Sequence, residues 1–338
     1  MDKKKRDPDK ITLFRHLLHL QKKNGVYNMD FLKEKVWREN RTWTDIFPLT
    51  LAIAYVLLFA GVIISNIIGA NKWGYLFNSD PDVVTFMGVY AEFVGIWLSV
   101  LFVVIIFKGN RPMLKCLVPE KKSKIVTGIL IGLLFGFAFN SLNVVGSILL
   151  GNLKLSYNSV EIKTLIGFLL FVMIQSGAEE MLARFFCYQK LRRRFKDPAV
   201  AVFGNSLLFL IMHLKNHGLN LASYLELFLW GVLFSLIILY FDNLWACIAI
   251  HTAWNFTQNI IYGLPNSGKV SKYSIFHLDA ATNDFFFDTG FGVEGSWGAV
   301  LFITIVIAIL IIKFKGREAN DLWEGWTDPY KQDNKAKA

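Results

Sequence analysis

Three apolar segments of the chain carry ionisable or strongly polar side chains that could do chemistry. These side chains are Glu179, Glu180, Arg184, His213, His251 and Asn255. A charged side chain at membrane depth costs from about 2.5 to well over 10 kcal/mol, so such residues are usually kept for a function. Carboxylates, imidazoles and an amide donor are the groups that hydrolysis of a peptide bond requires. The residue types therefore indicate hydrolytic chemistry between helices.

The spacing of these residues predicts which of them can meet. Glu180 and Arg184 are four residues apart, so they share a helix face and can form an ion pair that offsets part of the cost of burial. His251 and Asn255 are also one turn apart and can point together into a cavity. Glu179 is rotated by about 100° from Glu180. We therefore expect the two carboxylates to have different partners.

These positions suggest a division of roles. A carboxyl group in a low-dielectric cavity binds a proton more readily, which suits Glu179 to take a proton from water with the help of His213. His251 and Asn255 would then donate hydrogen bonds to the tetrahedral oxyanion. A single histidine in a helix is more often a packing residue. The combination with Glu179 is what favours catalysis.

Helix geometry also predicts the depth of the site. Glu179 and His213 are each 17 residues from Lys196, so a hairpin of two helices brings them level. The short turn at Asp242 and Asn243 ends eight residues before His251, which is roughly 12 Å along a helix. From this we expect the site to open toward the end of the helices that carries the basic turns.

The elements that hold these residues are predicted to be membrane helices. The chain of 338 residues is 54% hydrophobic, and its mean hydropathy is +0.41. A membrane helix needs about 20 mostly apolar residues. Eight stretches approach this length, at 48–70, 83–107, 125–150, 165–188, 199–213, 223–241, 244–262 and 297–312. We predict an all-α fold, a polytopic bundle of about eight transmembrane helices.

The distribution of basic residues predicts the orientation of these helices. The net charge is +10, but 29 of the 36 Lys and Arg residues fall before the first span, in alternate connections, or after the last span. By the positive-inside rule both termini are cytoplasmic, in a multi-pass protein of the cell membrane. Anionic lipid headgroups, rather than nucleic acid, are the expected partner of this charge.

Read in chain order, the polar residues form three motifs: Glu179-Glu180-x-x-x-Arg184, Phe209-x-x-x-His213 and His251-x-x-x-Asn255. Together they resemble the motifs of the CPBP family, the CAAX-prenyl-protease and bacteriocin-processing (Abi) membrane proteins. The resemblance covers about residues 165–262. It implies an eight-helix fold and endopeptidase activity on a membrane-associated peptide or a lipidated CAAX-like protein. It also implies that Arg184 holds the glutamates, while Phe209 is expected to wall the cavity.

The resemblance leaves the cofactor open. The family is named a metalloprotease, yet catalysis without a bound metal is also argued for it. Zinc is the candidate metal, with Glu179, His213 and His251 as candidate ligands, because histidine and carboxylate side chains bind zinc. No HExxH motif is present.

The predicted organisation has three parts. Residues 1–47 form a cytoplasmic segment whose amphipathic stretch at 11–20 suits either a helix on the membrane surface or a soluble helix. Residues 48–315 form the transmembrane domain, with the motif-bearing core at 165–262, and residues 316–338 form a cytoplasmic tail.

Two other functions compete with proteolysis. The same fold could act as a non-catalytic membrane scaffold or bacteriocin-immunity protein that binds a peptide. A transporter could use intramembrane carboxylates and histidines as a proton relay. The transporter has little support, because the sequence shows no repeated halves and no paired Gly or Pro interruptions of its spans.

Overall fold

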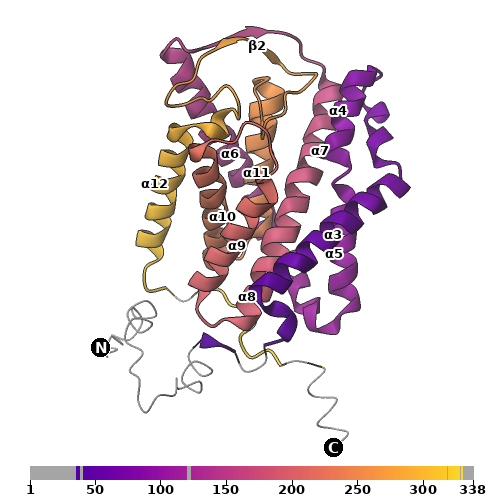
Figure 1. Cartoon of the computed structure of the whole chain (residues 1–338), viewed down its shortest axis with the longest axis vertical. Coiled ribbons are helices and arrows are strands. Elements are labelled where there is room, and N and C mark those ends of the chain that lie inside the picture. Colours follow the sequence, from indigo (N-terminus) through magenta and orange to yellow (C-terminus); the bar gives the residue numbers. More distant parts are fainter. Residues whose placement is uncertain (1–35, 39–40, 120–122, 318, 328, 330–338) are drawn as a thin grey trace, which may run out of the picture.

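The computed structural model describes residues 36–38, 41–119, 123–317, 319–327 and 329. Within these residues the chain is mostly helical, and its long helices run side by side in one bundle (Figure 1). The predicted amphipathic helix at 11–20 and most of the predicted segments 1–47 and 316–338 lie outside the described residues. The three-part division therefore stays a prediction.

Each predicted span coincides with a helical stretch. In chain order these are α3 (Phe47–Ile67), α4 (Pro81–Ala91) with α5 (Val94–Ile106), α6 (Ser123–Leu149), α7 (Ile162–Glu180) with a π-helix (Met181–Tyr188) and α8 (Gln189–Arg194), α9 (Pro198–His213), α10 (Leu221–Phe241), α11 (Leu244–Phe256) with a second π-helix (Thr257–Ile261), and α12 (Trp297–Phe314). Among the described residues, six stretches are long and apolar enough to cross a membrane. The other two are α9, which has 16 residues, and α11 with its π-helix. The chain is a polytopic helical membrane protein.

The prediction of an all-α fold was wrong in one respect. Strands β1 (Leu153–Tyr157) and β2 (Phe276–Ala281) pair in an antiparallel sheet at the end of the bundle opposite α8 (Figure 1). The strands are short and far apart in the sequence, so no hairpin turn signals their pairing. Their contact closes the loops that follow α6 and α11 over one end of the bundle.

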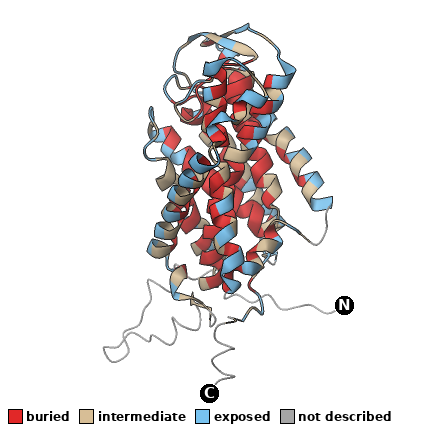
Figure 2. Cartoon of the chain, turned by 90° about the vertical axis from the view of Figure 1, so that its right-hand side faces the viewer, coloured by how far each residue is buried: buried red, intermediate tan, exposed pale blue. Residues whose placement is uncertain are grey.

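The outer surface of the bundle is apolar, as expected for contact with lipid. Large apolar side chains are widely exposed along the helices, for example Ile67 at 78%, Leu149 at 80% and Ile312 at 74%. The buried residues gather along the middle of the bundle (Figure 2). Polar residues are therefore enclosed by helices rather than exposed to the acyl chains.

Small residues bring α6 close to α11, the helix that carries His251. Gly132 and Gly136 face this helix, and a methyl group added to Gly132 would lie 2.8 Å from Cβ of Ala249. Glycines spaced four apart let two membrane helices approach closely and pack by van der Waals contact. This close approach fixes α11 and so fixes the position of His251.

A buried cluster of charged side chains fixes α8, the C-terminal end of the stretch that runs from α7 to α8. The carboxylate of Asp45, which is fully buried, accepts hydrogen bonds from Nε and Nη2 of Arg193 at 2.7 and 2.8 Å. Nζ of Lys190 lies 2.8 Å from the same carboxylate. Burial by itself would raise the pKa of Asp45, but the hydrogen bonds and charges of Arg193 and Lys190 outweigh it, and the pKa falls below the ordinary value of 3.8.

Asp45→Asn is expected to lower the thermal unfolding temperature at pH 7, because removing one partner of a buried ion pair costs about 3–5 kcal/mol. A carboxyl group with a lowered folded pKa stabilises the fold above its unfolded pKa, and this contribution disappears as the pH falls through the folded value. The difference between wild type and Asp45→Asn should therefore hold from pH 7 to about pH 5 and shrink below about pH 4. Thermal unfolding in detergent across this range tests it, with the exposed Asp82→Asn as control; a difference that does not depend on pH would contradict it.

Candidate functional site

Glu179 and Glu180 lie at the end of α7, directly before the π-helix Met181–Tyr188. The preceding turn holds Ser176, Gly177 and Ala178, whose small side chains leave room beside the carboxylates. π-Helical turns are rare and occur frequently at functional sites. Here the wider turn follows the two glutamates and carries Arg184.

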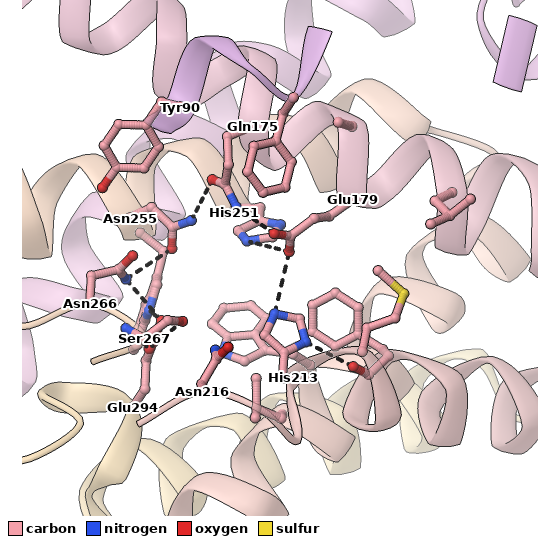
Figure 3. A pocket seen from close by; sticks show the side chains of 18 of the residues that line it. Tyr90, Gln175, Glu179, His213, Asn216, His251, Asn255, Asn266, Ser267 and Glu294 are labelled. Atoms are coloured by element: carbon pink, nitrogen blue, oxygen red, sulfur yellow. Dashed lines mark hydrogen bonds and ion pairs between the residues drawn. The ribbon is translucent and has the colours of Figure 1, made fainter. Parts of the chain in front are cut away.

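Glu179 faces two histidines from two other helices (Figure 3). Its Oε2 atom lies 3.5 Å from Nε2 of His213 on α9 and 3.8 Å from Nε2 of His251 on α11. The same Oε2 is buried and accepts no hydrogen bond from a protein group in the described residues. The other oxygen, Oε1, accepts a hydrogen bond of 2.5 Å from Nε2 of Gln175. The predicted meeting of Glu179 with both histidines is thus what the structure shows.

The second nitrogen of each histidine is held by a separate partner. Nδ1 of His213 lies 2.8 Å from the backbone oxygen of Phe209, and Nδ1 of His251 lies 3.0 Å from Oε1 of Glu180. Since both partners are acceptors, each Nδ1 carries the proton, and each Nε2 is the atom left to exchange a proton or a hydrogen bond in front of Glu179.

Glu180 has different partners from Glu179, as the helix rotation predicts. Nη1 of Arg184 lies 3.1 Å from Oε1 of Glu180, and both side chains are fully buried. The guanidinium of Arg184 also donates to the backbone oxygen of Trp230 at 3.2 Å and lies 4.3 Å from the ring centre of Phe209. In the structure Arg184 therefore holds Glu180 and packs on Phe209, whereas Glu179 is held by Gln175.

Asn255 lies one turn beyond His251 and points into the same cavity (Figure 3). Its Nδ2 donates to Oε1 of Gln175 at 3.1 Å. Its Oδ1 accepts a hydrogen bond of 3.2 Å from Nδ2 of Asn266. The predicted pair of His251 and Asn255 thus lines one cavity together with Glu179.

This cavity has a volume of about 200 Å³ and contains Glu179, Phe209, His213, His251 and Asn255 in its lining. Phe209 does wall the cavity. The apolar part of the lining comes from α3, α4, α5, α7, α9 and α10, from the π-helix that follows α7, and from Trp254 on α11.

The predicted opening toward the basic end is wrong. The lining includes residues from the loops after α9 and α11 and from the turn before α12, namely Asn216, Asn266, Ser267, Lys269 and Glu294. These loops lie at the end of α9 and α11 that is opposite to Lys190–Lys196. The rise per residue of the helices gives only the depth of a residue. It does not show which loops fold back over the bundle and border the cavity.

Several polar residues of the cavity were not predicted from the sequence. Gln175 precedes Glu179 by one helical turn, so its i to i+4 spacing could have identified it. Asn266, Ser267 and Glu294 lie in the long loop between α11 and α12, where neither helical spacing nor a motif indicates that they turn inward.

The three candidate metal ligands, Glu179, His213 and His251, lie close together. Among the described residues, no group of three or more His, Cys, Asp or Glu side chains is arranged to hold a metal ion. Each Nδ1 is occupied, and the Nε2 atoms face one oxygen of Glu179 at 3.5 and 3.8 Å. The mechanism below is derived from these side chains alone.

Comparison with known families agrees with the motifs. Residues 161–257 match the family described as "Rce1-like: Type II CAAX prenyl endopeptidase Rce1-like". This segment, from the start of α7 to the end of α11, is therefore a CPBP (Abi) domain of the Rce1-like type. It contains every residue of the three motifs. The comparison with curated proteins and the comparison with solved structures return no match.

Proposed function

We propose that this protein is an intramembrane endopeptidase in which Glu179 and His213 activate water to cleave a membrane-associated peptide. The observation that carries the proposal is the unpartnered Oε2 of Glu179, buried between the Nε2 atoms of two histidines in a polar cavity. A buried carboxylate oxygen without a partner is costly. A water molecule held in front of it would satisfy the oxygen and serve as the nucleophile.

The roles follow from the contacts. Glu179 takes a proton from the attacking water, and the free Nε2 of His213 accepts and returns protons beside it. His251, whose Nδ1–H is bound by Glu180, presents Nε2–H to the oxyanion when it is protonated. Asn255 supplies the second donor. After the tetrahedral intermediate collapses, the proton taken from water passes to the amine that leaves.

The substrate is a peptide or a lipidated CAAX-like protein that reaches the cavity from the membrane. The family of the 161–257 domain supports a peptide substrate. The positive-inside rule supports cytoplasmic termini and residence in the cell membrane, with anionic lipids at the basic end. In that orientation the loops that border the cavity are extracytoplasmic, which favours a peptide entering from that side or laterally over one entering from the cytoplasm.

The test is mass spectrometry of products after the purified protein is placed in liposomes with a peptide in prenylated and bare forms. Cleavage of either form at one bond by the wild type is the expected result. A non-catalytic scaffold or immunity protein of the same fold would bind the peptide without cleaving it. Its biological effect would also survive replacement of Glu179 and His213 by alanine.

Activity is expected to survive chelation, because in the proposed mechanism Glu179 takes the proton directly from water. After dialysis against EDTA or 1,10-phenanthroline, the rate of peptide cleavage should remain within about twofold of the untreated rate, since the proposed general base needs no metal-bound water. Loss of activity that is restored by added Zn²⁺ would refute the metal-free mechanism.

A further inference from the structure

Glu294 is a second buried acid at the cavity, and no role has yet been assigned to it. It lies just before α12 and is 5% exposed. Its Oε1 accepts hydrogen bonds from Nε1 of Trp254 at 3.2 Å and from Nδ2 of Asn266 at 2.9 Å. Its Oε2 accepts from the backbone N and the Oγ of Ser267 at 2.8 and 3.1 Å. All four contacts are donors, so Glu294 acts only as an acceptor.

This acceptor fixes the orientation of Asn266. An amide side chain can turn either its oxygen or its nitrogen toward a neighbour, and the hydrogen-bond network decides which. Opposite the carboxylate of Glu294 only the NH₂ group of Asn266 is stable. The same NH₂ group then donates to Oδ1 of Asn255 at 3.2 Å.

The orientation passes on through two more amides. Because Oδ1 of Asn255 accepts from Asn266, its Nδ2 faces Gln175 and Ser176, and it donates to Oε1 of Gln175 at 3.1 Å and to Oγ of Ser176 at 3.4 Å. One of these N–H groups must turn to the oxyanion when substrate is bound. Nε2 of Gln175 in turn donates to Oε1 of Glu179 at 2.5 Å. Asn266 therefore donates in two directions: to Glu294 on one side, and on the other side to Asn255, from which donor-to-acceptor bonds run through Gln175 to Glu179 (Figure 3).

The loop that carries Asn266 is held rigidly enough to transmit this orientation. Two amides of the π-helix Thr257–Ile261 bind its backbone: Gln258 donates to the oxygen of Pro265 at 2.5 Å, and Asn259 donates to the oxygen of Leu264 at 2.8 Å. The wider π-helical turn thus ties the loop to the same helical stretch that carries Asn255.

We propose that Glu294 is a positioning residue that orients the amide of Asn255, through Asn266, so that its NH₂ group faces the reaction centre. The proposal rests on the proposed function, in which Asn255 donates to the oxyanion. With the opposite orientation Asn255 would present its carbonyl oxygen to the developing negative charge and repel it. A glutamine at position 294 has only one acceptor oxygen. Its NH₂ group would then face other donors, either those of Trp254 and Asn266 or the backbone N–H of Ser267.

A double-mutant cycle on kcat/KM tests the proposal. We expect Asn255→Ala to reduce kcat/KM by about 100-fold, as for removal of an oxyanion donor. Glu294→Gln should reduce kcat/KM by about tenfold, mainly through kcat, because supporting residues typically contribute 10- to 100-fold. In the Asn255→Ala background, Glu294→Gln should cost less than about twofold, since its effect acts through Asn255. Additive losses would overturn the proposal, because a merely structural role of Glu294 would be additive.

Two further variants serve as an alternative and as a control for this double-mutant cycle. Asn266→Ala removes the same link from its other end, so it should show the same non-additivity with Asn255→Ala if Glu294→Gln does not fold. Asp284→Asn is the matched control, because Asp284 lies in the same loop and also accepts hydrogen bonds, from the backbone N of Phe286 and Phe287 and from Oγ of Ser147, but it does not line the cavity. Its effect should add to that of Asn255→Ala. Additivity for Asn266→Ala as well would overturn the proposal.

An assay without catalysis separates this proposal from the proposed function. In protein labelled with ¹⁵N-asparagine, the side-chain amide signal of Asn255 is the one missing from Asn255→Ala. We expect Glu294→Gln to shift this signal and Asp284→Asn to leave it in place. If Glu179→Gln keeps its activity, the proposed function fails, but a shifted Asn255 signal still supports the link. An unshifted signal overturns the link whatever the activity.

Discussion

Glu179→Gln is expected to reduce kcat for peptide cleavage by about 10³-fold, because positioned general bases contribute about 10²- to 10⁴-fold. The glutamine keeps a carbonyl oxygen for the hydrogen bond from Gln175, so the fold should be unchanged. Its NH₂ group, placed between the two histidine Nε2 atoms, cannot take a proton from water. Initial rates on the peptide, measured by mass spectrometry in liposomes, provide the test.

Glu226→Gln is the control for this substitution, since it makes the same change at a buried glutamate that does not line the cavity. It should retain most of the activity. If the Glu179→Gln protein cleaves the peptide at more than about half of the wild-type rate, Glu179 is not the base and the proposed mechanism fails. Unchanged thermal unfolding in both variants would show that the comparison concerns chemistry and not folding.

The helices were predictable because lipid contact leaves a strong signal in the sequence. Every predicted span corresponds to a helical stretch, since about 20 apolar residues between charged turns have few other stable structures in a membrane. The π-helices and the break between α4 and α5 at Glu92 were not predicted. Each of these changes the helix locally without interrupting the apolar run.

The core of the site was predictable for a related reason. Charged residues inside apolar runs are rare, so Glu179, Glu180 and the two histidines stood out, and helical spacing paired Glu180 with Arg184. The catalytic roles remain a proposal. Residues that reach the cavity from loops were missed, because loops obey no fixed periodicity. In the sequence Glu294 resembles an ordinary charged loop residue. Its place at the cavity becomes visible only in the fold, where the sheet of β1 and β2 and the start of α12 hold that loop against the bundle.

Arg184→Met is expected to cause the largest loss of stability of any substitution considered, because it leaves Glu180 as a buried charge without its cation. Removing one partner of a buried ion pair costs about 3–5 kcal/mol. The guanidinium also loses its hydrogen bond to Trp230 and its contact with the ring of Phe209. The variant should unfold at a clearly lower temperature in detergent and accumulate less in the membrane.

The double variant Glu180→Gln with Arg184→Met separates the effect of the unpaired charge from the effect of lost packing. Replacing both charges by neutral groups removes the unpaired carboxylate, so part of the lost stability should return. Activity should not return, because the Nδ1–H of His251 then has only a neutral amide oxygen as its acceptor, in place of the charged carboxylate that fixes the ring more strongly. A double variant no more stable than Arg184→Met would show that Arg184 acts through packing alone. A fully active double variant would show that His251 needs no negative partner to stabilise the oxyanion.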